Sequence, residues 1–404
     1  MKTGRRGEYA EFAALMFIQA GGMAAWFVPL GTVLDAHGLG AIKPYAFAAS
    51  AVAAFISPLF FGAMTDRHLS PVKVLRGLAL TTAATMALTG FAIEHQWNLW
   101  LVLAVIQAQS LCMAPTWCIA STVVFARLKN AGQEFGPIRA MGTLGWMGGC
   151  LIVSSLNADS SALAGYSGAV IWLVVASFTL ILPPMEAPAT DINLSWQERL
   201  GLDALTLFKN SQHRVIFITT ALLNVSIAAF YPYAPTHLHD LGFQHTAAWM
   251  SLGQSTEVVA MFALGGLLLW WPFKWVLATG LIFGMLRFVF SAGNTPGWLL
   301  LGIALHGASY ALVITLGQIY LETNVEAAWR ARAQALYAVM TGGVGNLLGY
   351  LGSDWWFHLC TTPAGTHWPR FWHGLAASVG AALIYFLICF RPRNKLIAPA
   401  ARGL

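Results

Sequence analysis

One apolar segment carries a cation, a hydroxyl and an indole at helical spacing. Arg139 is followed by Thr143 at i+4 and by Trp146 at i+7, so an α-helix would place all three side chains on one face. Such a face is unsuited to lipid, because a charge at membrane depth costs at least about 2.5–3.5 kcal/mol. A guanidinium and a hydroxyl can hydrogen-bond a polar solute, and an indole can stack on a flat ring. These residues predict one wall of a polar cavity.

A second apolar segment carries an amide and a carboxyl group. Gln254 and Glu257 are three residues apart, so one helix face presents both. An ionisable group at membrane depth usually faces a cavity or a partner, which makes Glu257 a candidate for the same polar cavity. The alternative is a neutral acid that hydrogen-bonds a neighbouring helix and has only a structural role.

Further polar and aromatic residues inside apolar segments are candidates for the same cavity. His306 is followed by Tyr310 at i+4, and Gln19 precedes Trp26 in the first apolar segment. For His306, a side chain that lines the cavity and one that is satisfied in a packing role are equally good interpretations. For Arg287, also in an apolar segment, we expect a structural pair or a side chain that reaches the membrane surface.

The composition requires a membrane protein to hold these residues. The chain has 404 residues, of which 57% are hydrophobic and only 9% are charged, and its mean hydropathy is +0.64. Soluble domains contain about 25% charged residues. Apolar runs of roughly 20 residues without sustained alternation recur along the chain, which predicts an all-α polytopic membrane protein and excludes an outer-membrane β-barrel.

Twelve apolar segments are long enough to cross a bilayer as helices, in two sets of six. We expect residues 1–184 to form an N-terminal half, 185–212 a cytoplasmic connector, and 213–404 a C-terminal half with a short tail. Residues 196–210 of the connector alternate apolar and charged positions at helical spacing, which indicates a helix on the membrane surface or a simple tether. The predicted spans are residues 9–33, 44–65, 72–92, 97–126, 139–157, 162–184, 213–236, 245–269, 272–292, 296–322, 331–357 and 368–390.

The basic residues predict the orientation of the chain. The net charge is +6, and most Lys and Arg residues lie in the two tails and in alternate loops. The positive-inside rule then places both termini in the cytoplasm, as an even number of spans across a cell inner membrane requires. The five cysteines have neither zinc nor redox spacing, so we expect no metal site and no cofactor.

The loop after the second span carries a sequence typical of a gate. Gly62 permits close approach of helices, while Asp66 and Arg67 can pair with charges across a cytoplasmic opening. The sequence from Gly62 to Arg67 resembles the signature of major facilitator transporters. A degenerate copy, with Gly265 and Gly266 but no acid, occupies the corresponding place in the second half.

The chain as a whole resembles the nucleoside:proton symporter family of the major facilitator superfamily, which includes the enterobacterial nucleoside permeases. The fifth-span sequence from Pro137 to Trp146 carries the resemblance. The resemblance implies two six-helix halves with a solute site between them. Further matches follow in the same order at Leu200–Ala204, Leu207–Asn210, Gln254–Glu257, Leu286–Phe288 and Arg330–Gln334.

The resemblance also implies roles for individual residues. In the family, an arginine, a threonine and an aromatic residue of the fifth span contact the nucleoside, and they match Arg139, Thr143 and Trp146. A glutamine and a glutamate of the eighth span match Gln254 and Glu257, and the glutamate is the proton-coupling acid.

Two spans depart from the family pattern. A glutamine and an asparagine of the seventh span are replaced by Ala228 and Tyr231. A tyrosine, a phenylalanine and an aspartate of the tenth span are replaced by His306, Tyr310 and Ala311. The loss of two amides and a carboxylate removes hydrogen-bond partners for a nucleoside, so the solute is a different nucleoside subset or another small polyhydroxylated molecule. His306 is a candidate to replace part of the lost polar function.

We therefore predict a secondary active transporter that imports a nucleoside-like solute with protons, as a functional monomer, by alternating access. A proton-coupled sugar importer is the first alternative, and a non-transporting receptor or a polytopic membrane enzyme is less favoured. The outer residues His237, His239, Asp240 and His245 fit no metal-ligand pattern, and we expect no catalytic residue and no nucleic-acid partner. The predicted solute contacts are Arg139, Thr143, Trp146, Gln254, Glu257, His306, Tyr310, Gln19, Trp26 and Tyr231, of which Glu257 and His306 are the predicted proton-coupling residues.

Overall fold

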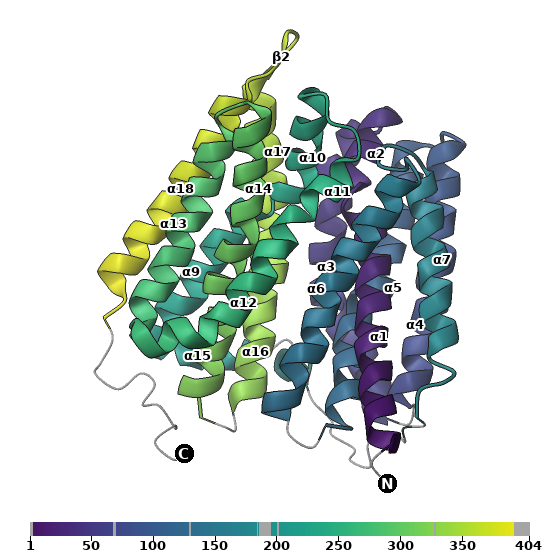
Figure 1. Cartoon of the computed structure of the whole chain (residues 1–404), viewed down its shortest axis with the longest axis vertical. Coiled ribbons are helices and arrows are strands. Elements are labelled where there is room, and N and C mark those ends of the chain that lie inside the picture. Colours follow the sequence, from purple (N-terminus) through teal and green to yellow (C-terminus); the bar gives the residue numbers. More distant parts are fainter. Residues whose placement is uncertain are drawn as a thin grey trace. The chain divides into compact units, whose positions relative to one another are not determined.

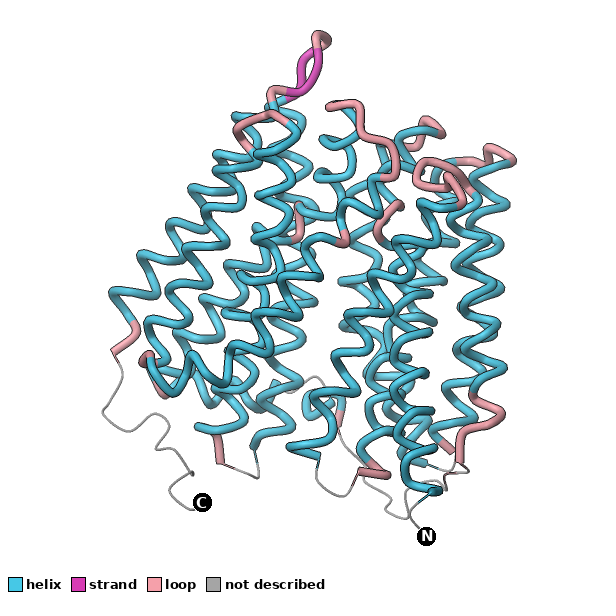
Figure 2. Tube along the Cα trace, viewed as in Figure 1, coloured by secondary structure: helices cyan, strands magenta, loops and turns pink. Residues whose placement is uncertain are grey.

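The structure is a computed structural model, and it consists almost entirely of helices (Figure 2). Within the described part of the chain, the strands are an antiparallel hairpin of β1 (Thr361–Thr362) and β2 (Gly365–Thr366). The structure describes residues 3–67, 70–128, 131–183, 185, 195–199, 202–326 and 329–391, and among these it leaves out the side chains of 3–7, 58–67, 131–134, 136 and 199.

The chain forms two compact units (Figure 1). Unit 1 comprises Met1–Asn193 and Tyr231–Ser251, and unit 2 comprises Leu194–Phe230 and Leu252–Leu404. The helices of unit 1 are α1 (Thr3–Phe27), α2 (Leu30–Ala36), η1 (Gly40–Ile42), α3 (Lys43–Arg67), α4 (Pro71–Glu94), α5 (Leu99–Phe125), α6 (Ala131–Ser155), α7 (Leu163–Phe178), α10 (Phe230–Asp240, from Tyr231 onward) and α11 (Thr246–Met250). The helices of unit 2 are α8 (Trp196–Arg199), η2 (Leu202–Lys209), α9 (Ser211–Ile227), α12 (Leu252–Trp270), α13 (Phe273–Ser291), α14 (Pro296–Tyr310), η3 (Ala311–Thr315), α15 (Leu316–Asn324), α16 (Arg330–Ala338), η5 (Val339–Gly345), α17 (Asn346–Cys360) and α18 (Trp368–Cys389).

Each of the twelve predicted spans coincides with a helix or with consecutive helical segments. Nine segments of the described residues are long and apolar enough to cross a membrane. α6 begins at Ala131, before the predicted start of the fifth span at residue 139, and continues through Pro137. Hydropathy detects the apolar part of a helix and not its polar end. Arg139 therefore lies about two turns inside α6.

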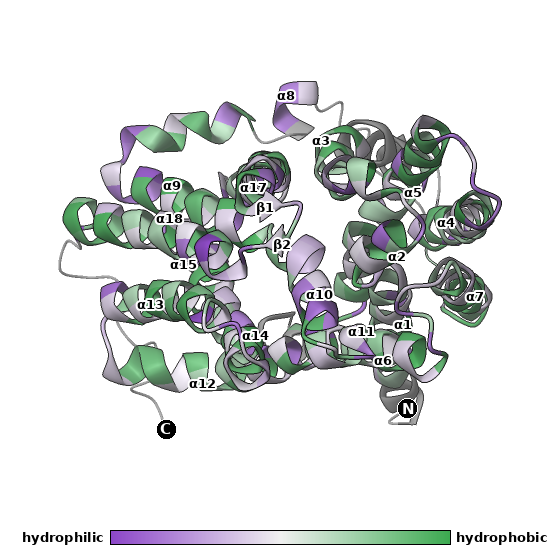
Figure 3. Cartoon of the chain, turned by 90° about the horizontal axis from the view of Figure 1, so that it is seen from above, coloured by the Kyte–Doolittle hydropathy of each residue, from purple (hydrophilic) through white to green (hydrophobic). Residues whose placement is uncertain are grey.

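In unit 1, α1 and α6 pack closely through glycines. A Cβ atom at Gly145 would overlap the carbonyl group of Phe17, and one at Gly149 would overlap the carbonyl group of Gly21. Small residues allow membrane helices to approach this closely. Figure 3 looks along the helices and shows α1 beside α6. This contact fixes the position of the α6 face that carries Arg139.

We expect Gly145→Ala to destabilise the protein by about 1–3 kcal/mol, because the added methyl group forces the backbones of α1 and α6 apart. Thermal unfolding of the purified protein in detergent, followed by intrinsic fluorescence, measures this loss. Gly265→Ala is the matched control, since a Cβ at Gly265 of α12 meets nothing within 4 Å. Equal unfolding temperatures for the two variants would contradict the close packing.

In unit 2, α12 and α14 cross at Gly307. A Cβ atom there would overlap the carbonyl group of Gly253 and the backbone nitrogen of Glu257. At the same crossing, a Cβ at Gly253 would lie 3.4 Å from the Cβ of His306. The crossing brings predicted site residues of the eighth and tenth spans together.

The tenth and eleventh spans each contain a π-helical stretch. η3 begins directly after Tyr310, and η5 occupies the middle of the eleventh span. The hydroxyl group of Tyr337 donates to the carbonyl group of Ile314 within η3 at 2.9 Å, which satisfies part of the widened turn. π-helical turns are frequent at functional sites.

The described part of the connector is attached to unit 2 by ion pairs. The guanidinium of Arg332, at the start of α16, lies 3.3 Å from the carboxylate of Glu198 and 3.0 Å from that of Asp203. The backbone N–H and the hydroxyl group of Ser195 both donate to Glu198 at 2.9 Å. These contacts to Ser195, together with the charge of Arg332, lower the pKa of Glu198 below its ordinary value. These ion pairs hold the described part of the connector against the start of α16.

We expect acidification to loosen this attachment. A carboxyl group whose pKa is lowered in the folded state stabilises that state above its unfolded pKa, and the stabilisation disappears as the pH falls through the lowered value. At neutral pH, Arg332→Gln removes both ion pairs, so cleavage of the connector by a protease should accelerate about twofold to fivefold. Limited proteolysis followed by mass spectrometry measures this rate.

Arg330→Gln is the control for the connector. Arg330 lies 3.6 Å from Glu322 and outside the contact of Arg332 with the connector. If both variants were cleaved as slowly as the wild type at neutral pH, the ion pairs would not hold the connector.

Candidate functional site

Four aromatic residues gather around the predicted wall of unit 1. The ring of Tyr231 lies 5.3 Å from that of Phe27 and 5.9 Å from that of Trp146. Phe27 also lies 6.2 Å from Trp146 and 5.2 Å from Phe47. α1, α3, α6 and α10 each contribute one ring, and edge-to-face contacts of this kind fix the orientation of an indole. The structure therefore brings the predicted residues Trp146 and Tyr231 together.

The three residues predicted to share one face of α6 are similar in burial. Arg139, Thr143 and Trp146 are all half-buried. The guanidinium of Arg139 lies over the ring of Trp117 at 5.7 Å, and Trp117 packs where Gly142 leaves room for it. Within the described residues, the buried Nε1 of Trp146 has no hydrogen-bond acceptor. Because a buried N–H without an acceptor is costly, this atom is a natural donor to a polar solute.

The two predicted residues of the first span differ in what they offer. Gln19 is fully buried, and its amide nitrogen donates to the hydroxyl group of Thr116 at 3.0 Å. Its amide oxygen has no donor among the described residues, so it can accept a hydrogen bond. Trp26 is 1% exposed and packs in the interior of unit 1 in this structure. A solute contact by Trp26 stays a prediction that needs a rearrangement.

In unit 2, an arginine, a histidine and a phenylalanine form a buried stack. Arg287 is 1% exposed, and its guanidinium donates to Nδ1 of His306. The ring of Phe230 stacks on that of His306 at 4.1 Å, and Arg287 lies over Phe230 at 4.4 Å and over Phe288 at 4.6 Å. The structural pair expected for Arg287 is confirmed, and the extension to the membrane surface was wrong. His306 is buried between Arg287 and Phe230.

The remaining predicted residues of unit 2 lie around the crossing of α12 and α14. Gln254 is almost completely buried, whereas Glu257 and Tyr310 are half-buried. The ring of Tyr310 is 6.2 Å from that of His306, and Glu257 lies against Gly307, the residue that follows His306. A carboxyl group, an amide, an imidazole and a phenol are thus brought together, which suits the binding of a polar solute and a proton.

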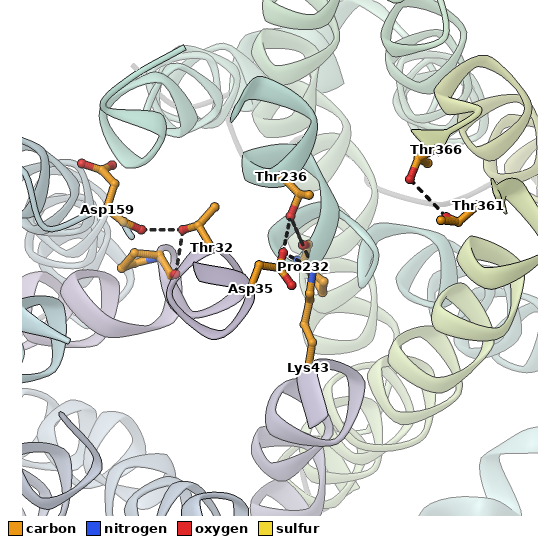
Figure 4. A network of polar contacts seen from close by, with 9 residues as sticks. Thr32, Asp35, Lys43, Asp159, Pro232, Thr236, Thr361 and Thr366 are labelled. Carbon is orange, nitrogen blue, oxygen red and sulfur yellow. Dashed lines mark hydrogen bonds and ion pairs between the residues drawn. The ribbon is translucent and has the colours of Figure 1, made fainter. Parts of the chain in front are cut away.

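An ion pair that the sequence reading missed holds α10 against the first two spans. Lys43 at the start of α3 pairs with Asp35 at the end of α2, and the hydroxyl group of Thr236 in α10 donates to the same carboxylate at 3.2 Å (Figure 4). The ammonium group of Lys43 also lies 5.5 Å from the ring centre of Tyr233. The short spacing of Asp35 and Lys43 in the sequence, on either side of a turn, could have predicted this ion pair.

A second polar contact holds α11 to α6. The carboxylate of Asp159 accepts hydrogen bonds from the backbone N–H of Ala247 at 2.7 Å and from the hydroxyl group of Ser154 at 2.9 Å. The hydroxyl group of Thr32 donates to the carbonyl group of Asp159 (Figure 4). Asp159 therefore acts as a cap for the first turn of α11 from another part of the chain. Together with the Lys43 pair, it explains why Tyr231–Ser251 belongs to unit 1.

The predicted gating residues lie at the end of α3. Gly62, Asp66 and Arg67 are within the helix, but their side chains are outside the described part of the chain. Their role stays a prediction. Across the residues that the structure describes, no group of three His, Cys, Asp or Glu residues is arranged to hold a metal ion.

The sequence matches the family model of the nucleoside H⁺ symporters over residues 8–395. The chain belongs to this family. Among its relatives in Escherichia coli strain K12, the putative nucleoside transporter YegT is 30% identical, over 96% of this chain and 95% of the relative. The nucleoside permease NupG is 27% identical over 95% and 96% of the two chains, and the xanthosine permease is 24% identical over 93% of each.

Superposition on solved structures supports the assignment to the symporter family. The crystal structure of NupG superposes with a TM-score of 0.83 at 27% identity, over 95% of this chain and 99% of that one. The POT family transporter PepTSo superposes with a TM-score of 0.73 at 12% identity, over 94% of this chain and 97% of that one, which concerns the fold alone. This nucleoside H⁺ symporter therefore has the major facilitator fold, and the prediction of that fold is confirmed.

Proposed function

We propose that this member of the nucleoside H⁺ symporter family imports a nucleoside together with a proton. The family match over residues 8–395 carries the proposal. The unsatisfied indole N–H of Trp146 and the unsatisfied amide oxygen of Gln19 support a polar solute in unit 1. Import against a gradient needs coupling to an ion gradient, and the family is described as coupled to protons.

We assign roles to the predicted residues on this basis. Arg139, Thr143 and Trp146 contact the nucleoside from unit 1, and Gln254 contacts it from unit 2. Glu257 carries the proton, because it is a half-buried carboxyl group that lies beside α14 and is three residues from the amide side chain of Gln254. The broader list of solute contacts (Gln19, Trp26, Tyr231, His306 and Tyr310) and a proton-coupling role of His306 belong to the same proposal.

The same family supports a proposal for the cellular setting. We propose a location in the cell inner membrane, with both termini in the cytoplasm and the residue ranges 1–184 and 213–404 as the two six-helix halves. The distribution of Lys and Arg supports this orientation. We further propose that the protein is active as a monomer and catalyses no chemical reaction.

Uptake of labelled uridine and adenosine into proteoliposomes with an imposed pH gradient tests the proposal. We expect accumulation when the interior is alkaline, and nucleoside-dependent proton entry measured with a pH-sensitive dye. Competition by sugars and not by nucleosides would favour the sugar importer instead. Binding without any solute flux or proton flux would indicate a receptor.

A further inference from the structure

Among the described residues, the guanidinium of Arg139 is held by a ring and not by an acid. It lies over the half-buried indole of Trp117 in α5, at 5.7 Å from the ring centre, which is within the range of cation–π attraction. An aromatic face attracts the charge but offers no oxygen acceptor, so the five N–H groups of the guanidinium stay available to a solute. A carboxylate in the same place would occupy two of these groups.

The indole of Trp117 has a fitted place on α6. A Cβ atom at Gly142 would lie 2.6 Å from Cη2 and 3.5 Å from Cζ3 of this ring, so even a methyl group would displace the ring. Gly142 follows Arg139 by three residues, which places the two on neighbouring turns of one helix face. The space at Gly142 therefore fixes the ring beside the guanidinium.

α1 contacts both of the helices that form this pair. The amide nitrogen of Gln19 in α1 donates to the hydroxyl group of Thr116, the residue before Trp117, at 3.0 Å. Two residues before Gln19, the carbonyl group of Phe17 lies against Gly145 of α6. One turn of α1 is thus bonded to α5 and packed on α6, and it fixes the spacing of these two helices.

A proline near the ring is accommodated without loss of a hydrogen bond. Pro115 lies two residues before Trp117 and has no N–H to donate to the carbonyl group of Leu111. The hydroxyl group of Ser57 in α3 donates to that carbonyl group at 3.3 Å, and α5 continues as a helix through the proline. The backbone that carries Trp117 is therefore held by α3 as well as by α1.

We propose that Trp117 is a positioning residue for solute binding: its ring holds the guanidinium of Arg139 in place and leaves the N–H groups free to bind the nucleoside. The inference rests on the proposed role of Arg139 as a solute contact. A long side chain that is already held loses less conformational freedom on binding, and this raises the affinity. Gly142 belongs to the same device, because it makes room for the ring.

Trp117→Leu in the full-length protein tests the positioning role. The variant keeps an apolar side chain and every proposed solute contact, but it loses the aromatic face. We expect the dissociation constant for uridine to rise about threefold to tenfold, because Arg139 must then be ordered by the solute itself. Trp117→Tyr, which keeps an aromatic face, should recover most of the affinity. Calorimetry on the purified protein measures these constants, and unfolding temperatures show how much folded protein each sample contains.

A second pair of variants shows whether Trp117 acts through Arg139. In an Arg139→Ala background there is no guanidinium to hold, so Trp117→Leu should change the dissociation constant less than about twofold. The titration of this pair extends to correspondingly higher uridine concentrations. An equal loss of affinity in both backgrounds would overturn the proposal, since it would mean that the ring touches the solute itself or only stabilises the fold.

Trp100→Leu is the matched control. Trp100 lies in the same helix, is 60% exposed and packs beside Tyr45, away from Arg139. Its replacement should leave the affinity for uridine unchanged. Gly142→Ala, in contrast, displaces the indole without altering it, so this variant should weaken binding in the wild-type background and have no further effect in Trp117→Leu. Additive effects of Gly142→Ala and Trp117→Leu would contradict the proposal.

A chemical measurement that needs no nucleoside separates this inference from the proposed function. Phenylglyoxal modifies guanidinium groups, and mass spectrometry follows the rate at each arginine. We expect Trp117→Leu to accelerate modification of Arg139 about twofold to fivefold, because the side chain loses the ring that covers it. Arg76, which is bonded to Thr179 in the same unit, is the internal reference and should react at the same rate in both proteins.

The two measurements have distinct outcomes. If Trp117→Leu accelerates modification of Arg139 but the wild type neither binds nor transports any nucleoside, the contact between ring and guanidinium stands and the proposed function falls. If the wild type transports nucleosides and Trp117→Leu changes neither the modification rate nor the affinity, the function stands and the positioning role of Trp117 is refuted.

Discussion

Glu257→Gln is expected to abolish accumulation of nucleoside against its gradient. The amide has nearly the same shape as the carboxyl group but cannot take up a proton, so the solute can cross only down its own gradient. We expect accumulation to fall to the level of protein-free vesicles, and residual exchange of labelled for unlabelled nucleoside to be insensitive to external pH. Uptake and counterflow in the same proteoliposomes measure the two quantities.

Glu322→Gln provides the control for this substitution. Glu322 lies in α15 of the same unit, is exposed, and pairs with Arg330 at 3.6 Å. Its replacement should leave accumulation unchanged. Undiminished and pH-dependent uptake by Glu257→Gln would remove Glu257 from the proton-coupling role.

Arg139→Ala is expected to weaken nucleoside binding strongly. A hydrogen bond to a charged group contributes about 1.5–3 kcal/mol, so the loss of the guanidinium should weaken binding about tenfold to a hundredfold. Arg139→Lys should recover only part of the affinity, because an ammonium group cannot form the planar pair of hydrogen bonds that a guanidinium offers. Thermal-shift titration and calorimetry with uridine on the purified protein measure both variants.

A second arginine of unit 1 shows whether the effect is specific. Arg76 donates to the hydroxyl group of Thr179 at 2.9 Å and to its carbonyl group at 3.0 Å, so Arg76→Ala should lower stability. Its nucleoside affinity should equal that of the wild type. Wild-type affinity in Arg139→Ala would instead give Arg139 a purely structural role over Trp117.

The membrane-spanning helices could be predicted because each one is an apolar run of the required length. The seventh span is interrupted between Ile227, where α9 ends, and Phe230, where α10 begins, and this break was missed because residues 213–236 are apolar on both sides of it. Pro232 was the feature of the sequence that could have predicted this break. Prolines also occur inside intact helices of this chain, however, as Pro115 and Pro137 do. Whether a proline breaks a membrane helix depends on the neighbours that satisfy the freed carbonyl group.

The candidate site was predictable where several polar residues share one helix face. Arg139, Thr143 and Trp146 needed only the period of the α-helix. The environment of His306 was not predictable, because it depends on Arg287 from another span and on Phe230 from a third. Sequence spacing cannot reveal contacts that form only when separate helices pack.

The contact between Arg287 and His306 determines the chemical form of the imidazole. A guanidinium can only donate, so Nδ1 must be the unprotonated nitrogen, and the ring hydrogen must reside on Nε2. In this tautomer the ring is neutral and the pair carries a single positive charge. A second proton would have to displace Arg287 before it could bind Nδ1. If His306 takes up a second proton during transport, the arrival of that proton and the departure of a buried arginine are therefore a single event.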